Sequence, residues 1–150
     1  RDATRPAGGA TSVRVTAVLR LPPFWCGIAV ATAKDYWGET RGPAIDLSRA
    51  IRLVFRARGE QGGEMIQVKL AIAGDKPYGD SARMPVATGW LRLSRDWQRF
   101  ELPLRAERGT PRSDLRRVIT PFAFVSDLAH NPAGEVTFFL DEIYFVMERD

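Results

Sequence analysis

The sequence of 150 residues contains only one cysteine, one histidine and three lysines. With Cys26 alone, the chain can form neither an internal disulfide nor a cysteine-rich metal site. His130 alone cannot build a metal site from several histidines. No apolar run approaches the roughly 20 residues that a bilayer-spanning helix needs, and residues 1–12 lack the apolar stretch of a signal peptide. We therefore expect no membrane insertion.

The charge is mildly positive and well mixed along the chain. The net charge of +4 comes from 22 basic residues, 19 of them arginine, interspersed with 18 acidic residues. Proteins that bind nucleic acid cluster their basic charge on one face, so we expect no nucleic-acid partner. The chain is 45% hydrophobic and 27% charged, as in globular proteins. Its length suits a single domain over residues 1–150.

Hydrophobic and polar residues alternate along most of the chain, which is the two-residue period of half-buried strands. Seven such segments are separated by turns rich in glycine and proline. They are residues 12–19, 25–31, 51–59, 64–72, 97–104, 118–127 and 135–148. Short strands with little helix predict an all-β fold, a two-sheet antiparallel β-sandwich of the jelly-roll type.

A few segments lie outside this strand pattern. Residues 45–50 and 112–118 are each expected to form at most a turn or two of helix, with Asp46 and Ser113 as caps. Residues 1–11 precede the first strand and are expected to be a flexible or degenerate first segment.

The stretch "LVFRARGEQGGEMIQVKLAI" predicts two strands joined by a sharp turn, because its glycine pair supplies the backbone angles that a hairpin needs. Alternation places Arg52, Arg56 and Arg58 on one side of the first strand. Gln67 and Lys69 share a side of the second, so that a hairpin would gather all five on one polar face. Such a face either binds a ligand through its guanidinium groups or is a solvated surface balanced by nearby glutamates.

The final segment, residues 135–148, carries bulky apolar residues at both even-numbered and odd-numbered positions, so a two-residue period does not assign it one buried face. It is therefore either buried on both faces or bulged near Asp141 and Glu142, where the strand would change face. Two adjacent carboxylates in such a strand are costly unless a cation, an arginine or a chain terminus neutralises them.

Seven short motifs occur in a fixed order over about 120 residues. They are "DYWGE" (35–39), "DLSRA" (46–50), "LVFRARGE" (53–60), "YGDS" (78–81), "LSRDWQRFELPL" (93–104), "DLRRV" (114–118) and "NPAGEVTFFLDEI" (131–143). In this order they resemble the galactose-binding-domain-like β-sandwiches, which are jelly rolls that include many carbohydrate-binding modules.

The resemblance implies a carbohydrate-binding function and, as in related sandwiches, a structural calcium ion for which Asp141 is the matching carboxylate. No other cofactor is expected. Arg56, Ala29 and Val30 stand where the family pattern has aromatic residues, and the strand expected before residue 12 is missing or degenerate. Sugar sites depend on flat aromatic faces, so these departures support a second hypothesis, a sandwich that keeps the fold without the sugar site.

Tyr36 and Trp37 are the leading candidates for stacking on a sugar ring, because the "DYWGE" turn can expose them. A large aromatic residue beside a glycine turn also commonly closes one end of a core, so that alternative stays open. Trp25 lines the same end of the sandwich or packs in the core. Trp90 and Trp97 are interpreted as core residues.

We therefore predict a non-catalytic carbohydrate-binding module, tethered to other domains of a larger protein that is secreted, periplasmic or at the cell surface. It would bind a poly- or oligosaccharide by stacking on aromatic residues, with hydrogen bonds from Arg56, Gln67 and Lys69. The alternative is a jelly-roll scaffold or assembly domain that has lost its sugar site. An enzyme is not expected, because the acidic residues are scattered and no triad order, nucleophile elbow or phosphate loop occurs.

Overall fold

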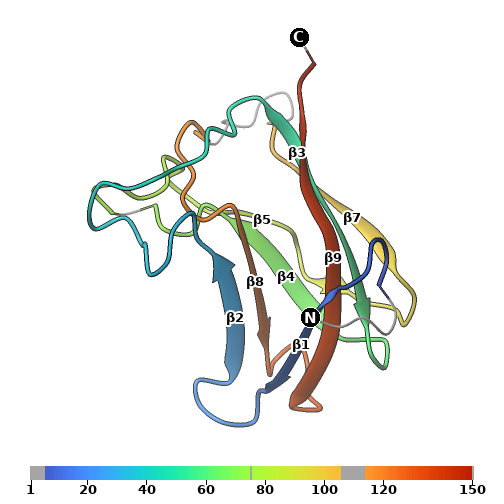
Figure 1. Cartoon of the computed structure of the whole chain (residues 1–150). Helices are drawn as coiled ribbons and strands as arrows, with labels where there is room; N and C mark the ends of the chain where they lie inside the picture. The colour runs from blue at the N-terminus through green and yellow to red at the C-terminus, as the bar shows by residue number, and fades with distance from the viewer. Residues whose placement is uncertain (1–5, 75, 106–113, 150) are drawn as a thin grey trace.

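The computed structural model describes residues 6–74, 76–105 and 114–149. These residues form two antiparallel sheets that face each other (Figure 1). The strands are β1 (Val13–Val18), β2 (Trp25–Val30), β3 (Ala50–Gly59), β4 (Met65–Leu70), β5 (Val86–Ala87), β6 (Leu91–Arg92), β7 (Gln98–Pro103), β8 (Phe122–Asp127) and β9 (Glu135–Met147).

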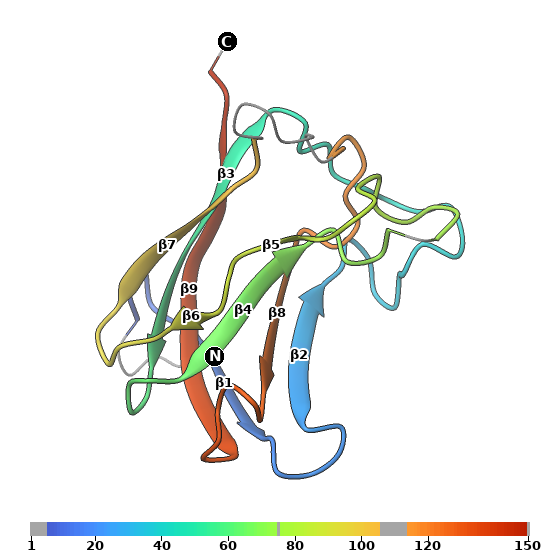
Figure 2. The same ribbon diagram turned by 180° about the vertical axis from the view of Figure 1, so that it is seen from behind.

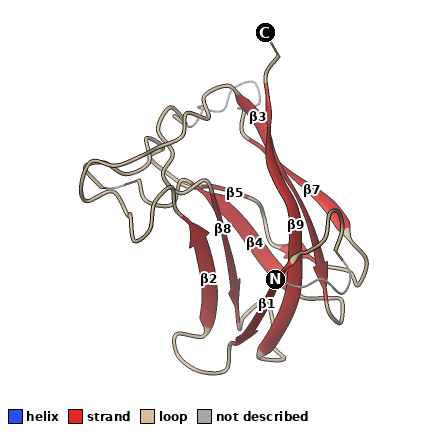
Figure 3. Cartoon of the chain, in the orientation of Figure 1, coloured by secondary structure: helices blue, strands red, loops and turns tan. Residues whose placement is uncertain are grey.

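One sheet, called here the β9 sheet, has the strand order β1-β9-β3-β7. The other, the β4 sheet, has the order β2-β8-β4-β5, and β6 also pairs with β4. β9 is in front in Figure 1 and β4 is in front in Figure 2. The described residues contain no helix (Figure 3), and therefore none that could cross a membrane.

The predicted fold class, a two-sheet antiparallel β-sandwich, is confirmed. All seven predicted strands occur, with ends shifted by a few residues. The sequence pattern missed β5 and β6, because strands of two residues each are too short to show a period.

The core lies between the sheets and is filled by the inward rows of both. Phe55 of β3 and Phe138 of β9 are fully buried, as is Val68 of β4. The ring of Phe124 on β8 meets that of Phe138 edge-on, with 5.1 Å between centroids. Phe122 meets Phe55 in the same way at 6.2 Å. Each buried ring contributes about 1.5–3 kcal/mol by leaving water, so these contacts hold the two layers together.

The predicted hairpin is wrong, because β3 and β4 belong to different sheets. Gly62 and Gly63, with φ of 82° and 101°, do reverse the chain. Phe55 and Val68 both belong to the core between the layers. The two strands therefore face each other across the core and do not pair edge to edge.

As a result, the polar face predicted for both strands does not exist. The arginines of β3 lie on the outer face of the β9 sheet, where Arg52 pairs with Glu101 at 3.3 Å and Arg56 pairs with Glu142 at 2.5 Å. Arg58 is buried against aromatic rings. Exposed ion pairs contribute little to stability, so this face fits the interpretation as a solvated surface balanced by glutamates.

The last strand bulges where the sequence indicates. Glu142 has a φ of 48°, and the register between β3 and β9 shifts between Val54 and Arg56. Before the bulge Phe138 packs in the core, and after it Phe145 packs against the same core. The extra residue in the bulge reverses which alternate residues face the core. This explains why bulky side chains occur at both even-numbered and odd-numbered positions.

Neither predicted helical turn is helical in the described residues. Residues 45–50 form a tight turn in which the Asp46 carboxylate accepts a hydrogen bond of 2.8 Å from the Ser48 amide. The other predicted cap, Ser113, lies outside the described residues, as do residues 1–5 of the predicted first segment.

Replacing Phe138 by alanine is expected to lower the free energy of unfolding by about 3–5 kcal/mol, because the change leaves a cavity between the sheets. Urea denaturation followed by tryptophan fluorescence measures this loss. The control is Phe24→Ala, the same change at a side chain that is 46% exposed, for which we expect a loss below about 1 kcal/mol. Equal losses in the two variants would contradict the layered core.

Candidate functional site

The outer face of the β4 sheet has a floor of small side chains. In one row across the strands, Ala29 lies opposite Ala123, Ala123 opposite Lys69, and Lys69 opposite Ala87. The neighbouring row consists of Gly27, Val125 and Gln67. Because four of these seven residues are alanine or glycine, this face leaves room for a ligand close to the backbone.

Three tryptophans rise around this floor. Trp25 and Trp37 line one hollow of about 490 Å³, and Trp25 and Trp90 line a second of about 370 Å³. Trp25, Lys69 and Val125 line both hollows. The two hollows are therefore neighbours on the same face of the sheet, and we call them together the groove.

Trp25 lies at the surface and not in the core. It begins β2 and is 53% exposed. Its ring lies beside Gly27, where a Cβ atom would come within 3.3 Å of the ring and 2.8 Å of the Phe124 carbonyl oxygen. Glycine at this position leaves the space that the ring occupies.

Trp37 and Tyr36, predicted together as stacking residues, occupy opposite environments. Trp37 is 43% exposed, whereas Tyr36 is 8% exposed. The Tyr36 hydroxyl accepts a hydrogen bond of 2.8 Å from Arg117 and donates one of 3.2 Å to the carbonyl oxygen of Tyr78. The prediction for Tyr36 is thereby corrected: its ring is packed inside and anchors the turn that exposes Trp37.

That turn rests on a neighbouring loop. Gly38 has a φ of 86°, and a Cβ atom on it would lie 2.6 Å from the Cα atom of Gly79. The Gly38 carbonyl oxygen accepts a hydrogen bond of 2.8 Å from the Tyr78 amide. Only glycine permits this approach with this backbone angle, so the position of Trp37 depends on the loop beneath it.

Asp80 ties the supporting loop to the start of β8. The carboxylate is buried and accepts four hydrogen bonds of 2.7–3.2 Å. The donors are the backbone amides of Ala73, Ile119 and Thr120 and the Thr120 hydroxyl. A buried charge is stable when it is hydrogen-bonded in this way, so Asp80 is structural.

The groove offers a few polar groups to a ligand. The Gln67 side-chain amide donates a hydrogen bond of 2.8 Å to the Thr88 carbonyl oxygen, which leaves its own oxygen as an acceptor. Lys69 stands where the two hollows meet. The Asp127 carboxylate lies 2.8 Å from Nδ1 of His130 and accepts a 2.9 Å bond from the His130 backbone amide.

One wall of the groove is formed by residues that the sequence pattern did not indicate. The ring of Trp90 stacks on that of His130, with 3.7 Å between centroids and 17° between planes. From the sequence, Trp90 was interpreted as a core residue, and the loop residue His130 either as plain surface or as an aid in binding a hydroxyl group. The two residues are far apart in the chain, so no local pattern indicates that they meet.

Two further residues of interest do not face the groove. Arg56, predicted to bind ligand, lies on the β9 sheet and is paired with Glu142, so it cannot share the site with Gln67 and Lys69. The Cys26 side chain packs against the core, and burial raises the pKa of its thiol. A raised pKa leaves little thiolate at neutral pH, which makes Cys26 a poor nucleophile.

Asp141, the predicted calcium ligand, is bound by backbone amides. Its Oδ2 atom accepts bonds of 2.8 and 3.1 Å from Ala7 and Gly8, and its Oδ1 atom accepts one of 2.8 Å from Glu142. The described residues contain no group of three or more His, Cys, Asp or Glu side chains that could hold a metal ion. As placed, these amide donors satisfy the carboxylate without a cation, and the calcium ion that the resemblance implies is put to the test by the cation-removal experiment below.

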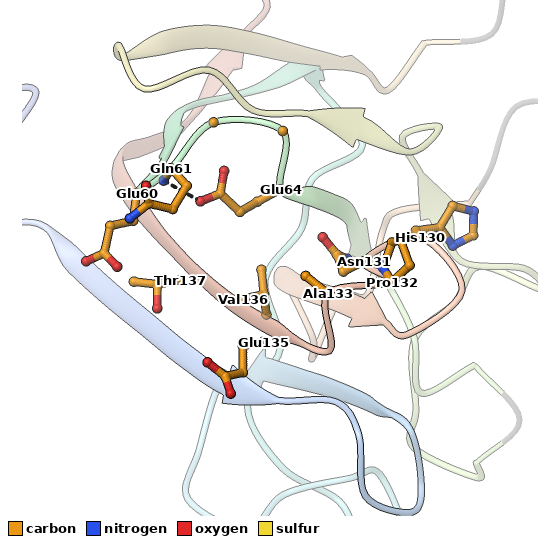
Figure 4. A pocket seen from close by; sticks show the side chains of 12 residues that line it. Glu60, Gln61, Glu64, His130, Asn131, Pro132, Ala133, Glu135, Val136 and Thr137 are labelled. Carbon is orange, nitrogen blue, oxygen red and sulfur yellow. Dashed lines mark hydrogen bonds between the residues drawn. The ribbon is translucent and has the colours of Figure 1, made fainter.

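A separate hollow of about 420 Å³ lies between the β3–β4 connection and residues 130–137 (Figure 4). Glu60 and Glu64 line it, and Glu64 accepts a hydrogen bond of 2.7 Å from the Gln61 amide, drawn as a dashed line in Figure 4. None of the predicted ligand-binding residues lines this hollow. The groove on the β4 sheet is therefore the candidate site, because Trp25, Trp37, Gln67 and Lys69 all line it.

No family model matches the sequence, and no curated protein matches it. Solved structures do match. Two crystal structures of a family 30 carbohydrate-binding module align at 19% identity with TM-scores of 0.65 and 0.64. They cover 99% and 98% of this chain and 73% and 82% of their own chains. A family 30 module of a cellulosomal cellulase of Clostridium thermocellum aligns at 18% identity with a TM-score of 0.62, covering 99% of this chain and 82% of that one.

The chain has the fold of a carbohydrate-binding module. The predicted jelly-roll resemblance is thus confirmed at the level of the fold. At this identity the similarity carries the arrangement of strands and not the identity of individual site residues.

Replacing Asp80 by asparagine is expected to lower the free energy of unfolding by about 2–4 kcal/mol, because an amide NH₂ group would face donors that now meet a carboxylate oxygen. Thermal and urea denaturation measure the loss. Tyr36→Phe removes one hydroxyl from the same loop cluster and is expected to cost only about 1 kcal/mol. An Asp80→Asn variant as stable as the parent would contradict the role assigned to this network.

Proposed function

We propose that the chain is a non-catalytic module that binds a poly- or oligosaccharide in the groove of the β4 sheet. The observation that carries the proposal is the convergence of Trp25 and Trp37, both substantially exposed, with Lys69 on one hollow. Large aromatic side chains exposed on a concave surface mark interaction sites. The fold shared with carbohydrate-binding modules supports the same conclusion.

The proposed mechanism is stacking combined with hydrogen bonding. The flat faces of Trp25 and Trp37 would cover the apolar C–H side of pyranose rings, since aromatic rings add contact area at a low entropy cost. The Gln67 oxygen and the Lys69 ammonium would bind hydroxyl groups at the rim of the rings. The floor of small residues lets a sugar chain approach the sheet closely.

The composition of the groove argues against hydrolysis. Glycosidases of the common classes use two carboxylates on either side of the scissile bond. Asp127 is the one carboxylate among the described residues that line the groove, and it is engaged with His130. We propose binding without catalysis, in a protein that is secreted, periplasmic or at the cell surface and that carries further domains.

The scaffold hypothesis rested on the missing aromatic residues at Ala29, Val30 and Arg56. In the structure Ala29 belongs to the floor of the groove and Arg56 faces away from it. The tryptophans that line the groove come from other positions, so the missing aromatic residues do not remove a stacking surface. A scaffold without a sugar site remains the outcome if no glycan binds.

Replacing Trp25 or Trp37 by alanine is expected to weaken polysaccharide binding at least about tenfold. Each change removes an aromatic face whose burial against a sugar ring contributes roughly 1.5–3 kcal/mol. Affinity electrophoresis in gels containing neutral or acidic polysaccharides measures the loss. Trp97→Ala, the same change at a residue that directly precedes β7 of the other sheet and does not line the groove, is the control that should retain binding. Undiminished binding in both Trp25→Ala and Trp37→Ala would rule out the groove as the site.

Removing divalent cations is expected to leave the melting temperature unchanged within about 1 °C, because amide donors already satisfy the Asp141 carboxylate. Thermal denaturation with EDTA and with added calcium measures this. Asp141→Asn is expected to lower the melting temperature in both conditions, since it disturbs those amide bonds. A melting temperature that rises with calcium in the parent and not in Asp141→Asn would establish the structural calcium site.

A further inference from the structure

Lys69 is the one cationic residue among the described residues that line the groove. It lies where the two hollows meet, so a ligand in either hollow would pass it. Its cross-strand neighbours on both sides are Ala123 and Ala87. Its side chain therefore stands above a row of alanines with no long neighbour in that row.

The Lys69 ammonium group has no hydrogen-bond or ion-pair partner among the described residues, although the residue is half-buried. The arginines of the β9 sheet differ in this respect, because Arg52 and Arg56 are both paired with glutamates. The apolar stem of Lys69 can pack along the sheet while the ammonium group stays available at the surface of the groove. A ligand anion would supply the missing partner.

The carboxylate in the groove does not fill this role. Asp127 lies at the Trp90 side of the groove and is held by His130, through both its backbone amide and its ring nitrogen. It does not line the hollow that contains Trp37. Among the described residues that line that hollow, Lys69 is the one charged residue, and their net charge is positive.

We infer that the groove takes an anionic glycan, whose carboxylate or sulfate group pairs with the Lys69 ammonium while its rings stack on Trp25 and Trp37. This inference rests on the proposed carbohydrate-binding function. An ammonium is a compact point charge that accepts either anion, so uronate-containing and sulfated chains share the chemistry required. Charge complementarity in a groove of low polarity favours specificity for such a ligand over a neutral one.

Affinity electrophoresis of the whole chain at low salt, in gels containing polygalacturonate, a sulfated galactan or a neutral β-glucan, tests the inference. We expect stronger retardation by one or both anionic polymers than by the glucan, weakened as salt screens the charge. Lys69→Met keeps the aliphatic stem and should reduce binding to the anionic polymer about tenfold. Lys69→Arg should largely preserve it. Lys34→Met, the same charge change at an exposed lysine that does not line the groove, is the matched control.

The outcomes separate the inference from the function on which it rests. A selective loss in Lys69→Met with either anionic polymer supports the inference, and the polymer affected identifies the anion. Equal retardation by neutral and anionic polymers, or equal losses in Lys69→Met and Lys34→Met, overturns it while leaving carbohydrate binding intact. No retardation by any polymer overturns both.

Discussion

The packing of one inward row of side chains from each sheet is the constraint on which the rest of the structure depends. Phe55 and Phe138 on one side and Phe124 and Val68 on the other exclude water from the space between the layers. The longer strands then have one face committed to the core and one face turned away from it, which is free over much of its length. The free faces are where the chain can vary its chemistry without loss of the fold.

The two free faces have been used in different ways. On the β9 sheet, Arg52 and Arg56 are balanced by glutamates, which leaves a soluble surface with its charges matched. On the β4 sheet, small residues form the floor, tryptophans form the walls, and Lys69 has no counter-charge among the described residues. A ligand that binds the open, apolar face can bury apolar surface and pair with Lys69. A ligand on the face of the β9 sheet would first have to replace existing ion pairs.

The exposure of Trp37 depends on residues that never meet a ligand. Tyr36 and Asp80 are buried beneath the loops at that end of the sandwich, and their hydrogen bonds fix the turn to the start of β8. A buried polar network of this kind specifies one arrangement because every alternative leaves a donor or a charge unsatisfied. The groove therefore has a rigid wall at the Trp37 side, and stacking there would lose little entropy.

The sequence alone determined the seven longer strands, because period-two alternation is a local signal. It also marked two places where the structure decided between alternatives, a bulge near Glu142 and the exposure of Trp37. It could not determine which strands pair. β3 and β4 carry a hairpin signal at Gly62 and Gly63, yet they lie in different sheets. Sheet assignment depends on which inward rows meet across the core, and that is a property of the whole chain. For this reason only the tertiary structure separated Arg56 from Lys69, buried Tyr36, and brought Trp90 to the groove.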